Sequence, residues 1–382
     1  MKSALTGLLL ILLLVACDRH PPVRSFPPDA YPQLLSEWGM LIRTDSHLVL
    51  GEGVQAYDLN TPLFTDYAQK LRTVWMPPGT AATYQADGAF DFPVGTIVSK
   101  TFFYGVRSTA PAEVASGTAT SGMVQAEYAW STGQDLPLHN VRLMETRLLV
   151  RQEAGWDALP YVWEGTDARL KIAGALIRVN LEYPQGAVEA LPYIVPTRNE
   201  CAACHATDHS TGELQPIGLK ARHLNRAYLG SGENQLREWH SAGRLRELPA
   251  LEQIARNADA ADAAQSIERR ARAYLDINCG HCHNPAGAAD TSGLLLDAST
   301  TSLRALGLCK PPIAAGQGTG GRAFSIVPGQ PDGSMLVFRM LSTDPGSRMP
   351  ELGRSLAHRE GVALVSEWIA TLPGECIQTS AD

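Results

Sequence analysis

The chain has 382 residues, and at roughly 150 residues per domain this length predicts two or three domains rather than a single small module. With 45% hydrophobic and 19% charged residues, the composition excludes a disordered chain and a bundle of membrane helices. A formal net charge of -7 argues against the broad electropositive surface that nucleic-acid binders use to displace counterions. We therefore expect no DNA or RNA partner.

The N-terminus has the pattern of a bacterial export signal. Lys2 precedes an apolar run over residues 8–16 that is too short to span a bilayer permanently. The run ends at Leu14-Val15-Ala16-Cys17, which is similar to a lipobox, so residues 1–16 are predicted to be a signal peptide and Cys17 a lipidated new N-terminus. Plain signal cleavage nearby is the alternative. We expect a periplasmic protein, lipid-anchored to the cell membrane, in a compartment where disulfides persist.

The chain before residue 198 favours a tether and then strands. Residues 17–49 are expected to form a proline-rich tether, because residues 20–32 contain too many prolines for regular structure. The region 50–197 holds alternating or β-branched and aromatic segments bounded by Gly, Pro, Asp or Asn, which predict strands over 95–103, 141–152, 159–163 and 175–183. An antiparallel β-sandwich-like domain is the expected architecture.

After Pro196 the pattern changes to a helical spacing of Ala, Leu, Arg and Glu. This spacing predicts helices over 233–245, 259–277 and 360–372, and the last two are expected to pack through Tyr274 and Trp368. The expected fold class is α+β multidomain, in which the β-sandwich-like domain is followed by two mainly α regions, 198–257 and 258–382.

One cysteine motif occurs in each of these regions, as Cys201-Ala202-Ala203-Cys204-His205 and as Cys279-Gly280-His281-Cys282-His283. Covalent haem c requires the pattern CxxCH, because two thiols add to the two vinyl groups and the next imidazole is directed at the iron. Zinc ribbons separate their CxxC pairs by about 15 to 20 residues, and thioredoxin-like pairs leave both histidines unexplained. The sequence therefore predicts two haem c groups, the first in 198–257 and the second in a cytochrome c-like domain over 258–382. The residues predicted to hold them are Cys201, Cys204, His205, Cys279, Cys282 and His283.

For the second haem, Met349 is the expected sixth iron ligand. It lies in a Gly/Pro-rich loop before the last predicted helix, an order of elements similar to class I cytochrome c. A thioether opposite an imidazole favours Fe(II) and raises the potential. Met335 and Met340 compete with it, but they lie in an apolar stretch where methionine is more often core filler.

For the first haem the sixth ligand stays open. The Pro216 carbonyl is expected to accept the imidazole N–H of His205, and His223 is the first choice for the sixth ligand. The alternatives are an open iron, or ligation by one of a set of other residues: His209, His240, Met76, Met123 and Met144. An open iron would permit small-molecule or peroxide chemistry.

Two cysteines are left after lipidation and haem attachment. Cys309 and Cys376 lie in one region of an exported protein, and this favours a disulfide between them. Such a bond would tie the segment after the second haem motif to the C-terminal tail.

The motifs together resemble a family of bacterial dihaem c-type cytochromes. Four segments carry the resemblance: residues 59–68 (LNTPLFTDYA), 196–201 (PTRNEC), 273–279 (AYLDINC) and 349–353 (MPELG). The resemblance implies a β-rich N-terminal part and two haem c motifs, often in a protein that occurs beside a parallel β-helix repeat protein. It implies no particular reaction.

We accordingly expect an electron-transfer protein more than an enzyme. Its partners would be redox proteins, such as a dehydrogenase or a parallel β-helix repeat protein, and the membrane through the N-terminal lipid. The alternative is a dihaem peroxidase or oxidase in which the first haem iron is open.

Overall fold

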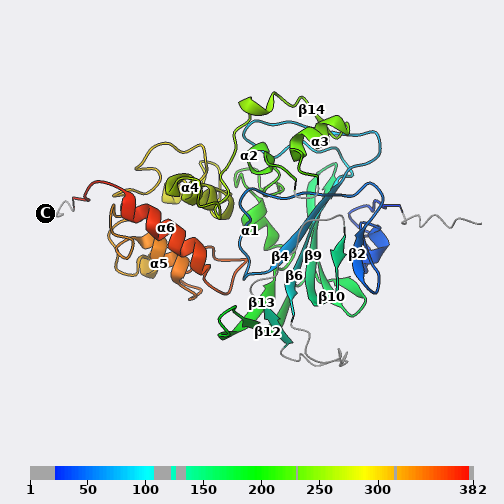
Figure 1. The fold of residues 1–382 in the computed structure, drawn as a ribbon, viewed down its shortest axis with the longest axis horizontal. Coiled ribbons are helices and arrows are strands. Elements are labelled where there is room, and N and C mark those ends of the chain that lie inside the picture. The colour runs from blue at the N-terminus through cyan, green and yellow to red at the C-terminus, as the bar shows by residue number, and fades with distance from the viewer. Residues whose placement is uncertain (1–21, 107–121, 126–134, 229–230, 314–315, 378–382) are drawn as a thin grey trace, which may run out of the picture.

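The computed structural model describes residues 22–106, 122–125, 135–228, 231–313 and 316–377 (Figure 1). Its largest element is a sheet with the strand order β11-β10-β9-β6-β7-β12-β13, to which β4 adds by pairing with β6 and β3 by pairing with β4. All of its pairings are antiparallel except that of β12 with β7. The strands are β3 (Gln55–Ala56), β4 (Gln69–Trp75), β6 (Ile97–Gly105), β7 (Gly122–Gln125), β9 (Val141–Gln152), β10 (Gly155–Glu164), β11 (Asp167–Leu170), β12 (Ala175–Glu182) and β13 (Val188–Val195).

Both faces of this sheet are covered at its centre. Along β6, Ile97, Ser99 and Thr101 alternate with Val98, Lys100 and Phe102, and successive side chains of a strand point to opposite faces. The face of Ile97 packs against N-terminal elements, in an apolar cluster that includes Trp38, Leu71, Leu148 and Leu159. The face of Val98 turns toward the CxxCH segments.

The N-terminal segment packs on the sheet instead of forming a tether as far as residue 49. The helical turn η1 (Leu35–Trp38) is followed by β1 (Leu41–Arg43) and β2 (His47–Leu50), which form a small sheet with β8 (Leu136–Pro137). Trp38 is fully buried, and its indole N–H donates to the hydroxyl of Tyr161 on β10 at 2.8 Å. The prediction of a tether over 17–49 is therefore wrong for its second half, because apolar residues there complete the core.

The predicted order of a β-sandwich-like domain followed by mainly α haem domains is wrong. Of the described residues, 26% lie in strands and 19% in helices. In the region 198–257 the helices are short: α1 (Cys201–His205), α2 (Ala221–Leu224) and α3 (Gln235–Ser241). They pack directly on the sheet, because Leu236 and Trp239 of α3 share one apolar cluster with Val74, Val98 and Leu149 of the strands. A two-residue parallel pairing of β14 (Leu245–Arg246) with β5 (Ala82–Thr83) also joins this region to the strand region.

The region after residue 258 is built on three helices beside the sheet (Figure 1). They are α4 (Ile267–Asn278), α5 (Met335–Leu341) and α6 (Arg359–Thr371). As predicted, Tyr274 of α4 and Trp368 of α6 lie in one apolar cluster. The two helices approach closely because residue 361 is glycine: a Cβ there would lie 2.3 Å from the Tyr274 hydroxyl oxygen.

Candidate functional site

The first CxxCH motif forms helix α1 at the end of the sheet. Two reciprocal hydrogen bonds close the turn before this helix: the Thr197 N–H donates to the Glu200 carboxylate at 2.8 Å, and the Glu200 N–H donates to the Thr197 hydroxyl at 3.2 Å. The His205 imidazole is fixed through Nδ1, which lies 2.8 Å from the carbonyl oxygen of Gln215. The acceptor is thus the residue before Pro216 and not Pro216 itself. With Nδ1 engaged as donor, Nε2 is left free to ligate a metal.

The second motif follows helix α4 and repeats this arrangement. Ser266 caps the helix by accepting from the Arg269 N–H. The His283 Nδ1 lies 3.0 Å from the carbonyl oxygen of Leu294, which is eleven residues later in the chain. Gly280 is required at the turn, since a Cβ there would lie 2.7 Å from the Asp276 carbonyl oxygen. Both proximal imidazoles are therefore oriented by a backbone carbonyl in the same way.

The two motifs touch each other. The Cys282 thiol of the second motif lies 3.5 Å from the carbonyl oxygen of Ala203 in the first. His209, four residues after the first motif, donates its backbone N–H to the Ala286 carbonyl at 2.8 Å. These contacts hold the two loops in one fixed relation.

One continuous cavity of about 480 Å³ joins both motifs. It is lined by the four motif thiols and by both proximal histidines, together with apolar residues of the sheet and of the α4–α6 region: Val98, Phe102, Leu149, Tyr274, Leu294, Leu296 and Val362. An apolar cavity with two thiols and one free imidazole nitrogen at each end fits the donor set of two haem c groups. Within the described ranges, no three His, Cys, Asp or Glu side chains are grouped so that they could hold a bare metal ion.

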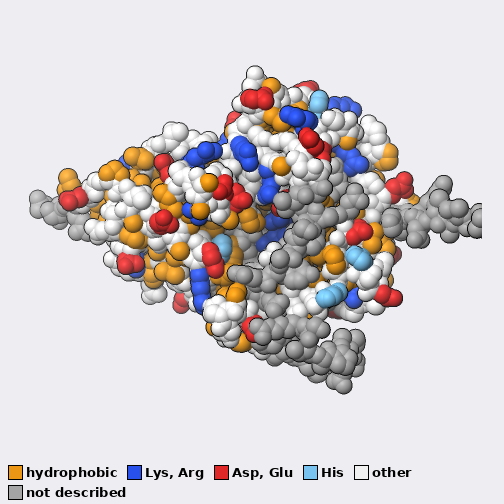
Figure 2. All heavy atoms as spheres, viewed as in Figure 1, with side chains coloured by type: hydrophobic (Ala, Val, Ile, Leu, Met, Phe, Trp, Pro, Cys, Tyr) orange, Lys and Arg blue, Asp and Glu red, His pale blue; other side chains and the backbone are white. Residues whose placement is uncertain are grey.

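The sheet wall of this cavity is cationic. Lys100 of β6 lies directly opposite Arg72 of β4 on one side and Arg147 of β9 on the other. These three residues and Lys70 all line the cavity. Burial, together with the charges of Arg72 and Arg147, lowers the pKa of Lys100 to about 7. Figure 2 shows Lys and Arg side chains in the middle of this face of the molecule, between the sheet and the α4–α6 region.

Three methionines line the second half of the cavity. Met335 and Met340 of α5 are each only 6% exposed, and Met340 belongs to the core between the helices. Met349 lies in the loop before α6, where its backbone N–H donates to the Arg339 carbonyl at 2.9 Å and its own carbonyl accepts from Arg354 at 2.8 Å. The loop is thus fixed by its backbone, which leaves the Met349 thioether free to act as a ligand.

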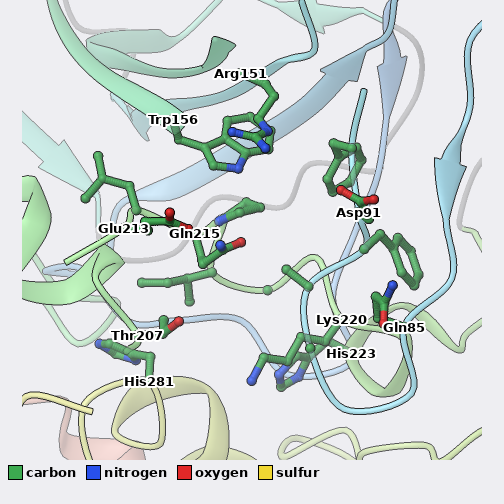
Figure 3. A pocket seen from close by; sticks show the side chains of 18 of the residues that line it. Gln85, Asp91, Arg151, Trp156, Thr207, Glu213, Gln215, Lys220, His223 and His281 are labelled. Atoms are coloured by element: carbon green, nitrogen blue, oxygen red, sulfur yellow. The ribbon is translucent and has the colours of Figure 1, made fainter. Parts of the chain in front are cut away.

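His223 does not lie at the first motif, so its prediction as the sixth ligand is wrong. It is 3% exposed, and its two ring nitrogens face Asn257 at 3.3 Å and Asp276 at 3.5 Å. Burial lowers its pKa to about 4. It lines a separate polar cavity of about 390 Å³, shown in Figure 3 with Arg151, Trp156 and His281. A buried, neutral histidine that is held by Asn257 and Asp276 has a structural role.

Four of the five other predicted alternatives do not line the cavity. Met76 and Met144 are buried in two apolar clusters of the sheet. His209 and His240 lie outside the cavity lining, where their Nδ1 atoms bond to backbone carbonyls. The side chain of Met123, in β7, lies outside the described part of the structure.

The segment 59–68 has a structural role that the sequence did not reveal. Thr61 accepts from the Ala260 N–H at 3.0 Å, and the Phe64 N–H donates to the Asn278 side chain at 2.8 Å, directly before the second motif. The buried Asp66 carboxylate accepts the N–H groups of Ser355 and Leu356 at 2.8 Å. The segment therefore connects the sheet to the helix that precedes one haem motif and to the loop that follows Met349.

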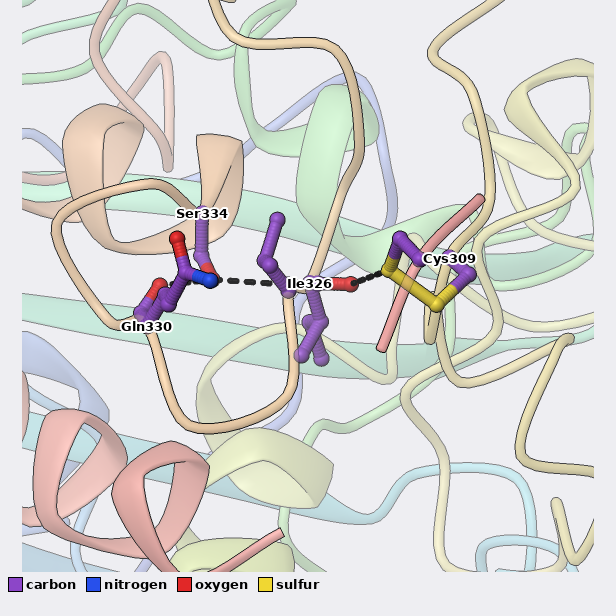
Figure 4. Close-up of a disulfide and its surroundings, with 6 residues drawn as sticks. Cys309, Ile326, Gln330 and Ser334 are labelled. Atoms are coloured by element: carbon purple, nitrogen blue, oxygen red, sulfur yellow. Dashed lines mark hydrogen bonds between the residues drawn. A yellow bond between two sulfur atoms is a disulfide. The ribbon is translucent and has the colours of Figure 1, made fainter. Parts of the chain in front are cut away.

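The predicted disulfide between Cys309 and Cys376 is confirmed (Figure 4). Its Cα–Cα distance is 5.1 Å, and it closes 67 residues of chain. The Cys309 N–H donates to the Ile326 carbonyl at 2.9 Å, which fixes the segment next to the cavity.

The predicted lipidation site, Cys17, and the signal peptide lie outside the described residues. Among the helices that the structure describes, none has the length and apolar character needed to cross a membrane. In comparisons with models of protein families, with curated proteins and with solved structures, nothing matches this chain.

Proposed function

We propose that the protein is a periplasmic, lipid-anchored dihaem c-type cytochrome that transfers electrons. The single observation that carries this proposal is that both CxxCH motifs touch each other and open into one apolar cavity. Covalent attachment at Cys201 and Cys204, and at Cys279 and Cys282, would fix two porphyrins with their thioether edges adjacent. Because electron tunnelling falls steeply with distance, adjacent edges favour rapid exchange between two sites.

Haem c, when bound, supplies an iron that cycles between Fe(II) and Fe(III). This chain's residues orient and insulate that iron. The carbonyls of Gln215 and Leu294 fix His205 and His283, each with Nε2 free. Met349 would supply a thioether for the second iron, which would stabilise Fe(II) there and raise its potential.

The partners that we propose are redox proteins, such as a dehydrogenase or a parallel β-helix repeat protein. Lipid at Cys17 would hold the cytochrome at the membrane surface.

A potentiometric titration with a peroxide challenge tests this function. The electron-transfer proposal predicts that the purified protein takes up two electrons in haem-like spectral steps and that the reduced protein turns over added peroxide no faster than free haem c peptide. Rapid peroxide turnover would contradict it and would favour the dihaem peroxidase. A protein that takes up no electrons would contradict both.

A further inference from the structure

A row of three cations crosses the wall of the cavity. Arg72, Lys100 and Arg147 occupy directly opposite positions on β4, β6 and β9, so they share one face of the sheet. The Cβ atoms of such neighbours lie about 4.5–5.5 Å apart, and like charges in these positions destabilise a sheet. Each member of the row therefore needs a compensating partner.

The two arginines have such partners within the chain. Arg72 is 3.5 Å from the Asp58 carboxylate, and Arg147 makes two bonds to Glu145, at 2.5 and 2.8 Å. For Lys100, no carboxylate or other acceptor lies within hydrogen-bonding distance in the part of the chain that the structure describes. The nearby Lys70 differs, because it donates to the Ala68 carbonyl and lies over the Phe102 ring. Lys100 thus faces the cavity with its amine uncommitted.

Lys100 lies near the first motif. Lys100, Cys201, Cys204 and His205 line the same cavity. Cys201 and Cys204 pack in the cluster of Val98, which lies two residues before Lys100 on the same face of β6. In haem c the propionates lie at the edge opposite the two thioethers, so a haem held by this motif would have its iron nearer to the Lys100 amine than its propionates.

The other residues of the cavity that could ligate iron are placed elsewhere. Met335, Met340 and Met349 belong to the second half of the cavity, with α5 and the loop before α6. His358 stacks on Phe64 and bonds to the Tyr274 hydroxyl. His281 lines both this cavity and the polar cavity, and it belongs to the second motif, between Cys279 and Cys282.

We propose that Lys100 supplies the sixth ligand of the first haem iron, opposite His205. This inference rests on the proposed attachment of two haems. Lys100 would bind as the neutral amine, giving its proton to water and its lone pair to the iron. With that position filled, the site would exclude external ligands and would act as an electron relay rather than a catalyst.

Carbon monoxide binding to the reduced protein tests the ligand. In the unchanged protein, neither haem is expected to bind carbon monoxide. Lys100→Ala should open one of the two haems, whereas the matched control Lys70→Ala should open none. Lys100→Met should close that iron again and raise its midpoint potential, because a thioether stabilises Fe(II).

The outcomes separate the two proposals. If the unchanged protein carries two haems and one of them binds carbon monoxide, the Lys100 assignment is wrong while haem attachment stands. If Lys100→Ala leaves both irons closed, the assignment is also wrong. A protein without attached haem contradicts the proposed function itself. Should Lys100→Ala fail to fold, the unchanged protein and Lys100→Met still decide the matter.

Discussion

At the scale of single residues, the proposed function assigns the sixth iron ligand of the second haem to Met349. Met349→Ala should open that iron to carbon monoxide and lower its midpoint potential, since the thioether that stabilises Fe(II) is lost. The control is Met340→Leu, which keeps the volume of a buried core position. Spectra and potentiometry measure both effects. If Met340→Leu opens the iron and Met349→Ala does not, the two roles are reversed.

Asp66 predicts a pH dependence of stability. Burial raises its pKa to about 6 from an ordinary 3.8, although the N–H groups of Leu356 and Ser355 oppose this shift. The folded state then holds the proton more tightly than the unfolded state, so the group's stabilising contribution is present below pH 3.8 and is lost as the pH rises through 6. The difference between the two pKa values corresponds to about 3 kcal/mol in the free energy of unfolding.

Asp66→Asn tests this dependence. Asparagine tolerates the positive φ of 47° at this position, so the backbone is preserved. The free energy of unfolding of the unchanged protein, relative to the variant, should fall between pH 4 and pH 7. Denaturant titrations at several pH values measure this difference, and parallel profiles would show that Asp66 is ionised throughout.

Sites that are defined by the spacing of residues along the chain could be predicted from the sequence. Sites that depend on the register between strands could not. The two spare cysteines indicated their disulfide, which the structure contains, and the two CxxCH motifs predict haem attachment. A lysine in a strand is usually exposed, however, and only the pairing of β6 with β4 and β9 shows that Lys100 lies between two arginines. His223 was predicted because histidine ligates iron, yet its Asn257 and Asp276 partners come from distant segments.

At the scale of elements, the contact between α4 and α6 depends on Gly361. Gly361→Ala would place a methyl group 2.3 Å from the Tyr274 hydroxyl oxygen, so the helices must separate. We expect a loss of about 2 kcal/mol in the free energy of unfolding, typical of overpacking. Glu367→Ala, at an exposed position of α6, is the control and should change stability by less than about 0.5 kcal/mol. Equal effects would mean that the close approach is unimportant.

The disulfide stabilises the segment beside the cavity. Cys376→Ser should lower the free energy of unfolding by about 4 kcal/mol in the chain-entropy account, because 67 residues separate the two cysteines. Denaturant unfolding with and without reductant measures the effect. Reductant should destabilise the unchanged protein and leave the variant unaffected, whereas an unchanged midpoint in both would contradict a structural role.

The elements themselves were predictable where their pattern was strong. The strand predicted over 141–152 has the same bounds in the structure, and the helix predicted over 360–372 is shifted by one residue. The helix predicted over 259–277 begins only at Ile267, because Asp259 and Asp262 accept local backbone N–H groups and Ser266 provides the cap. Residues that favour turns thus overrode the apolar spacing.

At the scale of the whole molecule, the sheet and the first haem region form one core. Leu236 and Trp239 pack with Val74 and Val98, so neither part can bury its apolar face alone. Periodicity predicts elements but not which faces meet, which explains why separate domains were expected. We predict that residues 50–197 expressed alone do not unfold cooperatively, as judged by calorimetry. A sharp unfolding transition of that fragment would instead show that residues 50–197 fold as an independent domain.

The central claim is that two porphyrins are joined to this polypeptide by thioethers. Intact mass spectrometry, after expression in a host that matures c-type cytochromes, tests it most directly. We expect the mass of the processed chain plus two haems, falling by one haem in Cys201→Ser/Cys204→Ser and by one in Cys279→Ser/Cys282→Ser. A mass equal to that of the processed chain alone would contradict the account.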